Sequence, residues 1–256
     1  MSSSLQLKAE RLRELHHGPA PLVLPNAWDA ASARLVEAAG FPVVATSSGA
    51  LNASLGWGDA SLAPPDEVFA AVSRVARAVQ VPVTADLEDG YGLSPEEFVA
   101  RLLSAGAVGC NLEDTDYRSG GAALVPAEAQ AERLAAVVEA GRSSGVDVVV
   151  NARVDVHLRG WGQPEERLDE ALRRARLYAG AGAVCVYPIT VHDEPTVRGL
   201  VAGAGAPVNF LARPLAADVE RLTRLGAARI SFGSGLARLA TTRLEEALAA
   251  LAPPPT

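Results

Sequence analysis

The fold is indicated by a short stretch that reads Val81-Pro82-Val83-Thr84-Ala85-Asp86 and is soon followed by Ser94-Pro95-Glu96-Glu97. The first part is apolar and β-branched, which is typical of a buried strand. In the second part, Ser94 can cap a helix whose first turn holds Pro95 and two acids. The stretch therefore predicts a strand that leads directly into a helix.

The same unit recurs along the chain, because β-branched runs alternate with longer stretches rich in Ala, Leu and Arg. Strands are predicted at 22–24, 43–46, 81–86, 108–112, 147–151, 183–187, 207–211 and 228–232. Helices are predicted at 29–39, 65–79, 94–105, 127–142, 164–180, 193–203, 215–225 and 234–249. This alternation implies parallel strands joined by crossovers, and eight such units have the size of a TIM barrel.

The limits of the barrel are also predicted. A further helix is expected over 5–17, before the first strand, and the proline-rich tail 251–256 is expected to fray. We see no linker or second domain. The prediction is a single α/β domain over 1–256.

Composition excludes several classes of protein. The 256 residues are 49% hydrophobic and 21% charged, as in an ordinary globular protein. The net charge of −7, without a run of Lys or Arg, argues against nucleic-acid binding. No signal peptide and no apolar run of membrane-spanning length is evident. We therefore expect a cytoplasmic protein, with Cys110 and Cys185 as buried free thiols.

The two ends of the predicted barrel differ. The helix-to-strand connections are short and plain, whereas the strand-to-helix connections hold most of the acids and all three tryptophans. TIM-barrel active sites lie at the C-terminal ends of the strands, so this asymmetry favours an enzyme over a scaffold. His16 and His17 fall at the opposite end and are expected to be exposed to solvent.

Four acids converge on neighbouring strand ends. Asp86 and Glu88 follow the third strand, Glu113 ends the fourth, and Asp59 lies in the loop after the second. Carboxylates at this density repel each other unless a cation lies among them, and oxygen ligands suit Mg²⁺. The alternative is a set of solvated loop acids without a metal.

Three further motifs have a functional and a structural interpretation. Arg153, in Asn151-Ala152-Arg153, can bind a substrate carboxylate or phosphate, or it can form a structural pair with Asp155 or Glu113. The segment 46–50 is either an anion-binding concavity or a plain turn. Phe232-Gly233-Ser234-Gly235 is explained equally well by phosphate binding and by helix capping.

Six aromatic side chains also fall on the strand-to-helix side, although aromatic residues are only 5% of the chain. They are Trp28, Trp57, Tyr91, Tyr117, Trp161 and Tyr187. We hypothesise that this rim closes over the site or contacts an apolar substituent on the substrate. The alternative is that these rings pack the loops.

These motifs together resemble the isocitrate lyase / phosphoenolpyruvate mutase superfamily, from Leu22 to the last helix. The segments that carry the resemblance are Leu24-Pro25-Asn26-Ala27-Trp28-Asp29, Thr46-Ser47-Ser48-Gly49, Ser54-Leu55-Gly56-Trp57-Gly58-Asp59, Thr84-Ala85-Asp86-Leu87-Glu88-Asp89-Gly90-Tyr91-Gly92, Asn111-Leu112-Glu113-Asp114 and Asn151-Ala152-Arg153-Val154-Asp155.

The resemblance implies a modified (β/α)8 barrel whose last helix, 234–249, is exchanged between the subunits of a homodimer or homotetramer. It implies Mg²⁺, or Mn²⁺ in its place, held by Asp86 with Glu88, Glu113 and Asp59 acting directly or through water. It also implies a small anionic metabolite as the substrate. The residues that we assign to catalysis are Arg153, Asp59, Glu113 and Tyr117. Those that we assign to substrate binding are Ser48, Gly49, Ala50, Trp28, Trp57, Asn151, Arg153 and Asn209.

Departures from the family pattern narrow the expected chemistry. The Lys-Lys-Cys-Gly-His loop of isocitrate lyases is absent, and 114–121 reads Asp-Thr-Asp-Tyr-Arg-Ser-Gly-Gly, a segment that could hinge as a lid. The gating loop of the mutases is absent too, and Glu88 replaces the commoner Asp. We predict a Mg²⁺-dependent lyase that cleaves a C–C bond of a 2-oxo or 2-hydroxy acid through an enolate. The cleavage is either an oxaloacetate-type decarboxylation or an aldol-type step with Tyr117, Arg118 or water as the proton source. Phosphonate P–C chemistry and a non-catalytic metabolite-binding barrel are the alternatives.

Overall fold

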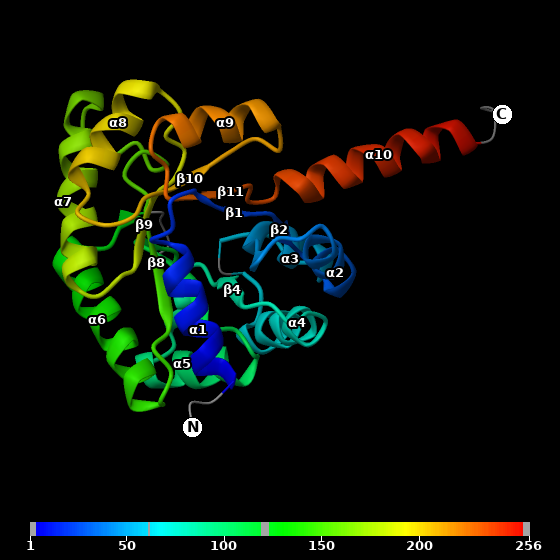
Figure 1. Ribbon diagram of the computed structural model, residues 1–256, viewed down its shortest axis with the longest axis horizontal. Coiled ribbons are helices and arrows are strands. Elements are labelled where there is room, and N and C mark those ends of the chain that lie inside the picture. Colours follow the sequence, from blue (N-terminus) through cyan, green and yellow to red (C-terminus); the bar gives the residue numbers. More distant parts are fainter. Residues whose placement is uncertain (1–3, 61, 119–122, 253–256) are drawn as a thin grey trace.

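The computed structural model describes residues 4–60, 62–118 and 123–252. The predicted 253–256 end of the tail and the Ser119-Gly120-Gly121 hinge lie outside these residues. Parallel strands run around a central barrel, and helices cover its outside (Figure 1). The fold is the α/β barrel that the alternating sequence pattern predicts.

One ring of strands closes the barrel. The larger sheet has the order β2-β3-β4-β5-β8-β9, and a second sheet has the order β1-β11-β10. A bridge between Val186 and Val208 joins β9 to β10. β1 and β2 are two parts of one extended stretch that is interrupted at Pro25, so they link the sheets on the other side. The strands are β1 (Leu22–Leu24), β2 (Asn26–Ala27), β3 (Val44–Thr46), β4 (Val83–Asp86), β5 (Gly109–Glu113), β8 (Val149–Val154), β9 (Cys185–Pro188), β10 (Asn209–Leu211) and β11 (Arg229–Ser231).

Helices begin where the sequence supplies caps. Ser94 accepts a hydrogen bond from the Glu97 N–H at 3.2 Å, and Asp29 and Ser32 form a capping box. Each cap satisfies an amide that has no partner inside its helix. The helices are α1 (Ser4–Leu15), α2 (Ala30–Ala38), α3 (Ser48–Ser54), α4 (Pro65–Arg77), α5 (Pro95–Ser104), α6 (Ala127–Ser143), α7 (Arg167–Gly180), α8 (Glu194–Gly203), α9 (Ala216–Arg224) and α10 (Gly235–Leu251), with short 3-10 turns η1 (Gly90–Gly92) and η2 (Pro164–Glu166).

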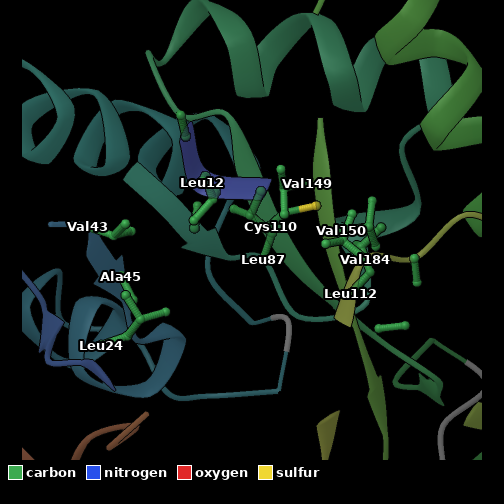
Figure 2. Packing of buried hydrophobic residues seen from close by; sticks show 14 of the residues in the cluster. Leu12, Leu24, Val43, Ala45, Leu87, Cys110, Leu112, Val149, Val150 and Val184 are labelled. Atoms are coloured by element: carbon green, nitrogen blue, oxygen red, sulfur yellow. The ribbon is translucent and has the colours of Figure 1, made fainter. Parts of the chain in front are cut away.

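Helix α1 packs against the N-terminal end of the barrel. Leu12 of α1 is fully buried, and Figure 2 shows it beside Cys110 and Val149. Gly109 makes this approach possible, because a Cβ atom there would lie 2.7 Å from a Leu12 methyl group. The prediction that His16 is exposed is wrong. His16 is 3% exposed, because it follows α1 where that helix packs against the barrel, whereas His17 faces solvent as expected.

The core is built from short apolar side chains of the strands and the helix faces that cover them. Val43, Leu24, Leu112 and Val184 are among the residues that Figure 2 shows at this centre. Both cysteines are buried free thiols, as predicted. A cluster of this kind is favourable because it removes apolar surface from water.

Two elements near the site differ from the prediction. The segment after β3 forms the short helix α3 instead of a plain turn, and Ser47, Ser48 and Gly49 at its start line a cavity. The loop after β5 carries an antiparallel pair, β6 (Thr115–Asp116) with β7 (Ala123–Leu124). Neither was detectable from periodicity, because both segments are too short to show one.

Helix α10 does not lie along the barrel but projects away from it (Figure 1). Leu239, Leu244, Leu248 and Leu251 on this helix are all exposed. An apolar groove of about 630 Å³ lies between α2 and α9, and Leu35, Phe41 and Val219 contribute to its walls. Within the described ranges, none of the helices has the length and apolar character needed to cross a membrane.

Candidate active site

A cavity of about 150 Å³ lies at the C-terminal ends of the strands. Strand ends, the first turn of α3 and the first turns of α10 all contribute to its walls. The lining residues are Asn26, Ser47, Ser48, Gly49, Asp59, Asp86, Asn111, Arg153, Tyr187, Ile189, Leu211, Ser231, Phe232, Gly233, Ser234 and Arg238. This is the end of the barrel where the sequence predicts the active site.

Asp86 is held in place from both sides. Its Oδ2 atom accepts hydrogen bonds from the Ser48 N–H at 3.0 Å and the Ser48 hydroxyl at 2.9 Å. Its Oδ1 atom accepts one from the Asn111 side-chain amide at 3.1 Å. As the last residue of β4, Asp86 lies at the cavity wall while neutral donors fix its rotamer.

The cavity wall around Gly49 depends on a close approach of chain segments. A Cβ atom at Gly49 would lie 3.0 Å from the Ser234 hydroxyl and 3.1 Å from an Asp59 carboxylate oxygen. Ser47 and Ser234 are hydrogen-bonded at 3.0 Å, which ties α3 to the start of α10. Glycine at 49 therefore lets Asp59 and α10 close over the cavity.

Arg153 reaches the cavity wall but is already paired. Its guanidinium donates to both oxygens of Asp155, at 2.6 and 2.9 Å, and forms an ion pair with Glu113. Only 10% of its side chain is exposed. The structural pairing considered for Arg153 is present, and it coexists with a position at the cavity.

The pairing of Arg153 is part of a closed ring of polar side chains. Thr115 donates to Asp155, Arg159 donates to Thr115 and to the Tyr117 hydroxyl, and Tyr117 donates to Glu113. Arg159 also stacks over the Tyr117 ring at 5.2 Å. Such a network fixes the loop after β5 because every member limits the rotamers of its neighbours.

The charges in this ring are shaped by burial. Burial raises the pKa of Glu113 well above its ordinary value, and the nearby Asp155 and Asp86 add to that effect. Burial and Glu113 also raise the pKa of Tyr117, so its phenol stays protonated and donates a hydrogen bond to Glu113. Burial disfavours the charge of Arg153, but Glu113 and Asp155 outweigh this and raise its pKa. Tyr117 and Glu113 are not among the cavity-lining residues.

A second cation neutralises the acid that follows Glu113. Asp114 accepts hydrogen bonds from Arg174 at 2.9 Å and from the Tyr178 hydroxyl at 2.7 Å. Its other oxygen accepts the Asp155 N–H at 2.8 Å, which connects it to the ring around Arg153. Burial raises the pKa of Asp114. This acid stabilises the loop and does not open to the cavity.

The predicted metal ligands Asp86, Glu88 and Glu113 are not brought together. Glu88 is buried and accepts a hydrogen bond from Asn52 at 2.7 Å, while Glu113 faces Arg153 and Tyr117. In the part of the chain that the structure describes, no three His, Cys, Asp or Glu side chains could hold a metal ion together. The carboxylates that line the cavity are Asp86 and Asp59. Two carboxylates fit a Mg²⁺ ion that keeps several of its waters, as this ion commonly does.

Several predicted substrate-binding residues lie elsewhere. Trp28 and Ala50 line a groove between α3 and α10, outside the cavity. Trp57 is 39% exposed and donates to Glu67 at 3.0 Å. Asn151 and Asn209 are fully buried and bind Asn111 and Ser231. Ser48 and Gly49 do line the cavity, but the Ser48 N–H is used by Asp86.

The predicted aromatic rim is not formed around the cavity. Of its six members, Tyr187 lines the cavity. Tyr91 packs its ring edge-on against Phe69, and Trp161 is bound through its carbonyl to Arg167. Tyr91 packs within the loops as the alternative interpretation holds, whereas Trp57 and Trp161 are 39% and 38% exposed.

Sequence reasoning missed several residues around the site, among them Arg238 of α10, Asn111 of β5 and Arg159 in the loop after β8. It left Ser234, the residue just before α10, open between phosphate binding and helix capping. A signal existed for Asn111, because it lies two residues before Glu113 on the same strand face. Ser234 and Arg238 are spaced by four residues, which places them on one helix face. Nothing local to Arg159 marks its contacts.

An α/β barrel with carboxylates, a buried arginine and a small polar cavity at its C-terminal end defines an enzyme-like site. Comparison with known families makes the assignment specific. Residues 12–252 match the phosphoenolpyruvate phosphomutase family, so the chain belongs to that family of lyases and mutases. An uncharacterised protein of Mycobacterium tuberculosis is 33% identical over 224 residues, covering 86% of this chain and 81% of its own length.

Two other relatives have more specific names. The 2-methylisocitrate lyase of Bacillus subtilis is 29% identical over 203 residues, 77% of this chain and 64% of that protein. A crystal structure from Burkholderia cenocepacia J2315, provisionally assigned as a phosphonomutase, has 36% identity and a TM-score of 0.84. It covers 95% of this chain and 98% of that one. Both names agree with the family resemblance read from the motifs.

Proposed function

We propose that this protein is a Mg²⁺-dependent lyase that cleaves a C–C bond of a small 2-oxo or 2-hydroxy acid. The observation that carries the proposal is the cavity in which Asp86 and Asp59 face Arg153 and the backbone of α3. When bound, Mg²⁺ would supply positive charge that stabilises the enolate of the 2-oxo product. Membership of a family that includes lyases agrees with this chemistry.

Each side chain has a distinct part in the proposal. Asp86 holds the cation in the orientation that Ser48 and Asn111 impose on it. The part of the Arg153 guanidinium that does not contact Glu113 or Asp155 faces the cavity, where it orients the substrate carboxylate. Gly49 binds the other end of the acid, because the Ser48 N–H is engaged with Asp86. Glu113 and Tyr117 act on Arg153 and the loop, outside the cavity.

The size of the cavity limits the substrate. Pockets for drug-sized ligands have volumes of about 300–1,000 Å³, and this one has about 150 Å³. Its walls carry two acids, two arginines and four serines from 47, 48, 231 and 234, so they suit a compact polyanion bridged by a cation. This favours a short diacid over a substrate with a large apolar substituent.

A screen by NMR tests the proposal. Oxaloacetate, substituted malates, methylisocitrate, phosphoenolpyruvate and phosphonopyruvate are incubated with the protein and Mg²⁺, with and without EDTA, and followed by proton and phosphorus spectra. A pyruvate-type product that EDTA suppresses would support the lyase. New phosphorus signals would favour phosphonate chemistry instead, which the family description and the Burkholderia relative suggest. No turnover across the panel would contradict both and favour a metabolite-binding barrel.

We also propose that the protein forms a homodimer or homotetramer in which α10 is exchanged. The projecting helix has Leu244, Leu248 and Leu251 exposed, and the groove between α2 and α9 is apolar. Burying both surfaces against each other would remove apolar area from water. Light scattering tests this with Leu248→Asp, which we expect to dissociate the assembly. Ala250→Asp, two residues and 200° further around the helix, is the matched control and should leave it intact.

A further inference from the structure

Arg229 is a buried cation inside the barrel that the proposed chemistry does not use. It belongs to β11, beneath the cavity, and its residue is 1% exposed. A charge removed from water is costly unless its surroundings compensate it. Burial lowers the pKa of Arg229, and Asp86 is the carboxylate that opposes this effect. Burying the Arg229 charge inside a strand therefore destabilises the fold unless neighbouring groups interact with that charge.

Its hydrogen bonds run toward two neutral groups. Within the described residues, Nη1 lies 3.3 Å from His16 Nε2, and Nη2 donates to Asn111 Oδ1 at 3.2 Å. His16 Nδ1 lies 2.8 Å from the Leu12 carbonyl, which can only accept. The Nδ1 atom therefore carries the proton, and Nε2 accepts from Arg229. Burial lowers the pKa of His16 to about 3, which keeps the ring neutral.

Arg229 determines which way the Asn111 amide faces. A guanidinium can only donate, so the Asn111 oxygen must point toward it and the Asn111 NH₂ group must point toward Asp86. Asn151 also contacts Asn111 Oδ1, at 2.8 Å, but an amide can donate or accept and would tolerate either orientation. If Asn111 turned over, its carbonyl would face the Asp86 carboxylate and repel it.

We propose that Arg229 is a positioning residue for Asp86, acting through Asn111. Its charge fixes the Asn111 amide, and the amide holds the Asp86 carboxylate against Ser48 at the cavity wall. The proposal rests on the proposed function, in which Asp86 binds the cation. Outer partners that orient a metal ligand commonly contribute about 10–100-fold in metal affinity or activity.

Arg229→Met tests the proposal, because it keeps the length of the side chain and removes its charge and donors. We expect the Mg²⁺ dissociation constant, measured by calorimetry, to rise about 10–100-fold, and kcat to fall by a similar factor with little change in the substrate KM. His16→Gln removes the other partner of Arg229 and is the matched control. It should lower stability and leave Mg²⁺ affinity within about twofold of wild type. An equal loss of affinity in the control would overturn the proposal, since it would indicate a general disturbance of the core.

Two further variants make the result specific. In an Asn111→Ala background, Arg229→Met should raise the Mg²⁺ dissociation constant by less than about a further twofold. The Asn111 side chain that connects Arg229 to Asp86 is already missing there. Arg229→Lys keeps the charge without the planar fork and should fold where Met does not. We expect an intermediate loss of about tenfold in Mg²⁺ affinity. Wild-type affinity in either Arg229 variant would overturn the proposal.

The test also separates this inference from the proposed function. If wild-type protein neither binds Mg²⁺ nor turns over any acid, the proposed function fails. Crystal structures of the wild type and Arg229→Lys then decide the inference by themselves. Loss of the Asn111–Asp86 contact in the variant would support it, and retention of that contact in an unchanged geometry would overturn it.

Discussion

Two neighbouring strands end in almost the same four residues, yet their acids have different roles. β4 leads into Asp86-Leu87-Glu88-Asp89 and β5 into Asn111-Leu112-Glu113-Asp114, and Asp86 pairs in register with Asn111. In the first segment, Asp86 is held by neutral donors and lines the cavity. In the second, Glu113 and Asp114 are paired with Arg153 and Arg174.

The difference teaches that the partner decides what a carboxylate does. A carboxylate bound by amides and hydroxyls keeps its negative charge available to a ligand. One that faces a buried guanidinium has its charge compensated within the protein and becomes part of the framework. Asn111 joins the two segments, because it stands at the equivalent position of Asp86 and donates to it.

The comparison is tested most severely by Asp86→Asn. This change keeps the size of the side chain and removes the charge that faces the cavity. We expect kcat/KM on the substrate identified by NMR to fall on the order of 10²–10³-fold, with the Mg²⁺ requirement lost. Asp147→Asn, at a half-exposed site near Arg142, is the control and should behave as wild type. Full activity in Asp86→Asn would refute its assignment to the cation.

Arg174→Met tests the framework role of the second segment. It leaves Asp114 and Glu170 without their buried cation, so we expect a loss of about 3–5 kcal/mol in the free energy of unfolding. Arg101→Met removes largely exposed pairs with Glu97 and Asp66 and should cost much less stability, because solvent screens these charges. Urea denaturation followed by circular dichroism measures both. Equal losses would mean that burial of the pair does not matter here.

Glu113→Gln tests whether the acids of the two segments affect different kinetic constants. Glu113 contacts Arg153 and Tyr117 and does not line the cavity, so neutralising it should alter the substrate KM through Arg153. We expect a rise in KM of about tenfold and a smaller change in kcat. A loss as large as that of Asp86→Asn, seen in kcat, would place Glu113 in direct contact with the reaction and break the comparison.

A pH effect on stability is expected at His16, which lies below both segments. Because its pKa is lowered from 6.5 to about 3 in the folded protein, the fold favours the neutral ring. The stability from this group is fully present above pH 6.5 and is lost as the pH falls toward 3. Between these values, wild type should lose up to about 1.4 kcal/mol per pH unit more than His16→Gln does. His17→Gln, at the adjacent exposed position, should follow the wild-type profile. Parallel profiles for wild type and His16→Gln would contradict the burial of the neutral ring.

The sequence by itself determined the order of strands and helices and the end of the barrel at which the acids gather. Local rules suffice for this, because β-branched runs form strands, Ser94 caps a helix, and parallel strands carry their C-termini to one side. The family motifs in turn placed Asp86, Asp59 and Arg153 at the cavity.

Only the tertiary structure decided which acids face the cavity and which are neutralised. Arg174 and Arg229 lie far along the chain from Asp114 and Asn111, yet they meet them inside the barrel. The burial of His16 follows in the same way from the packing of α1 against strands that come much later in the chain. Charge pairing depends on distances of a few ångströms in space, and the spacing of residues within one segment does not reveal these distances.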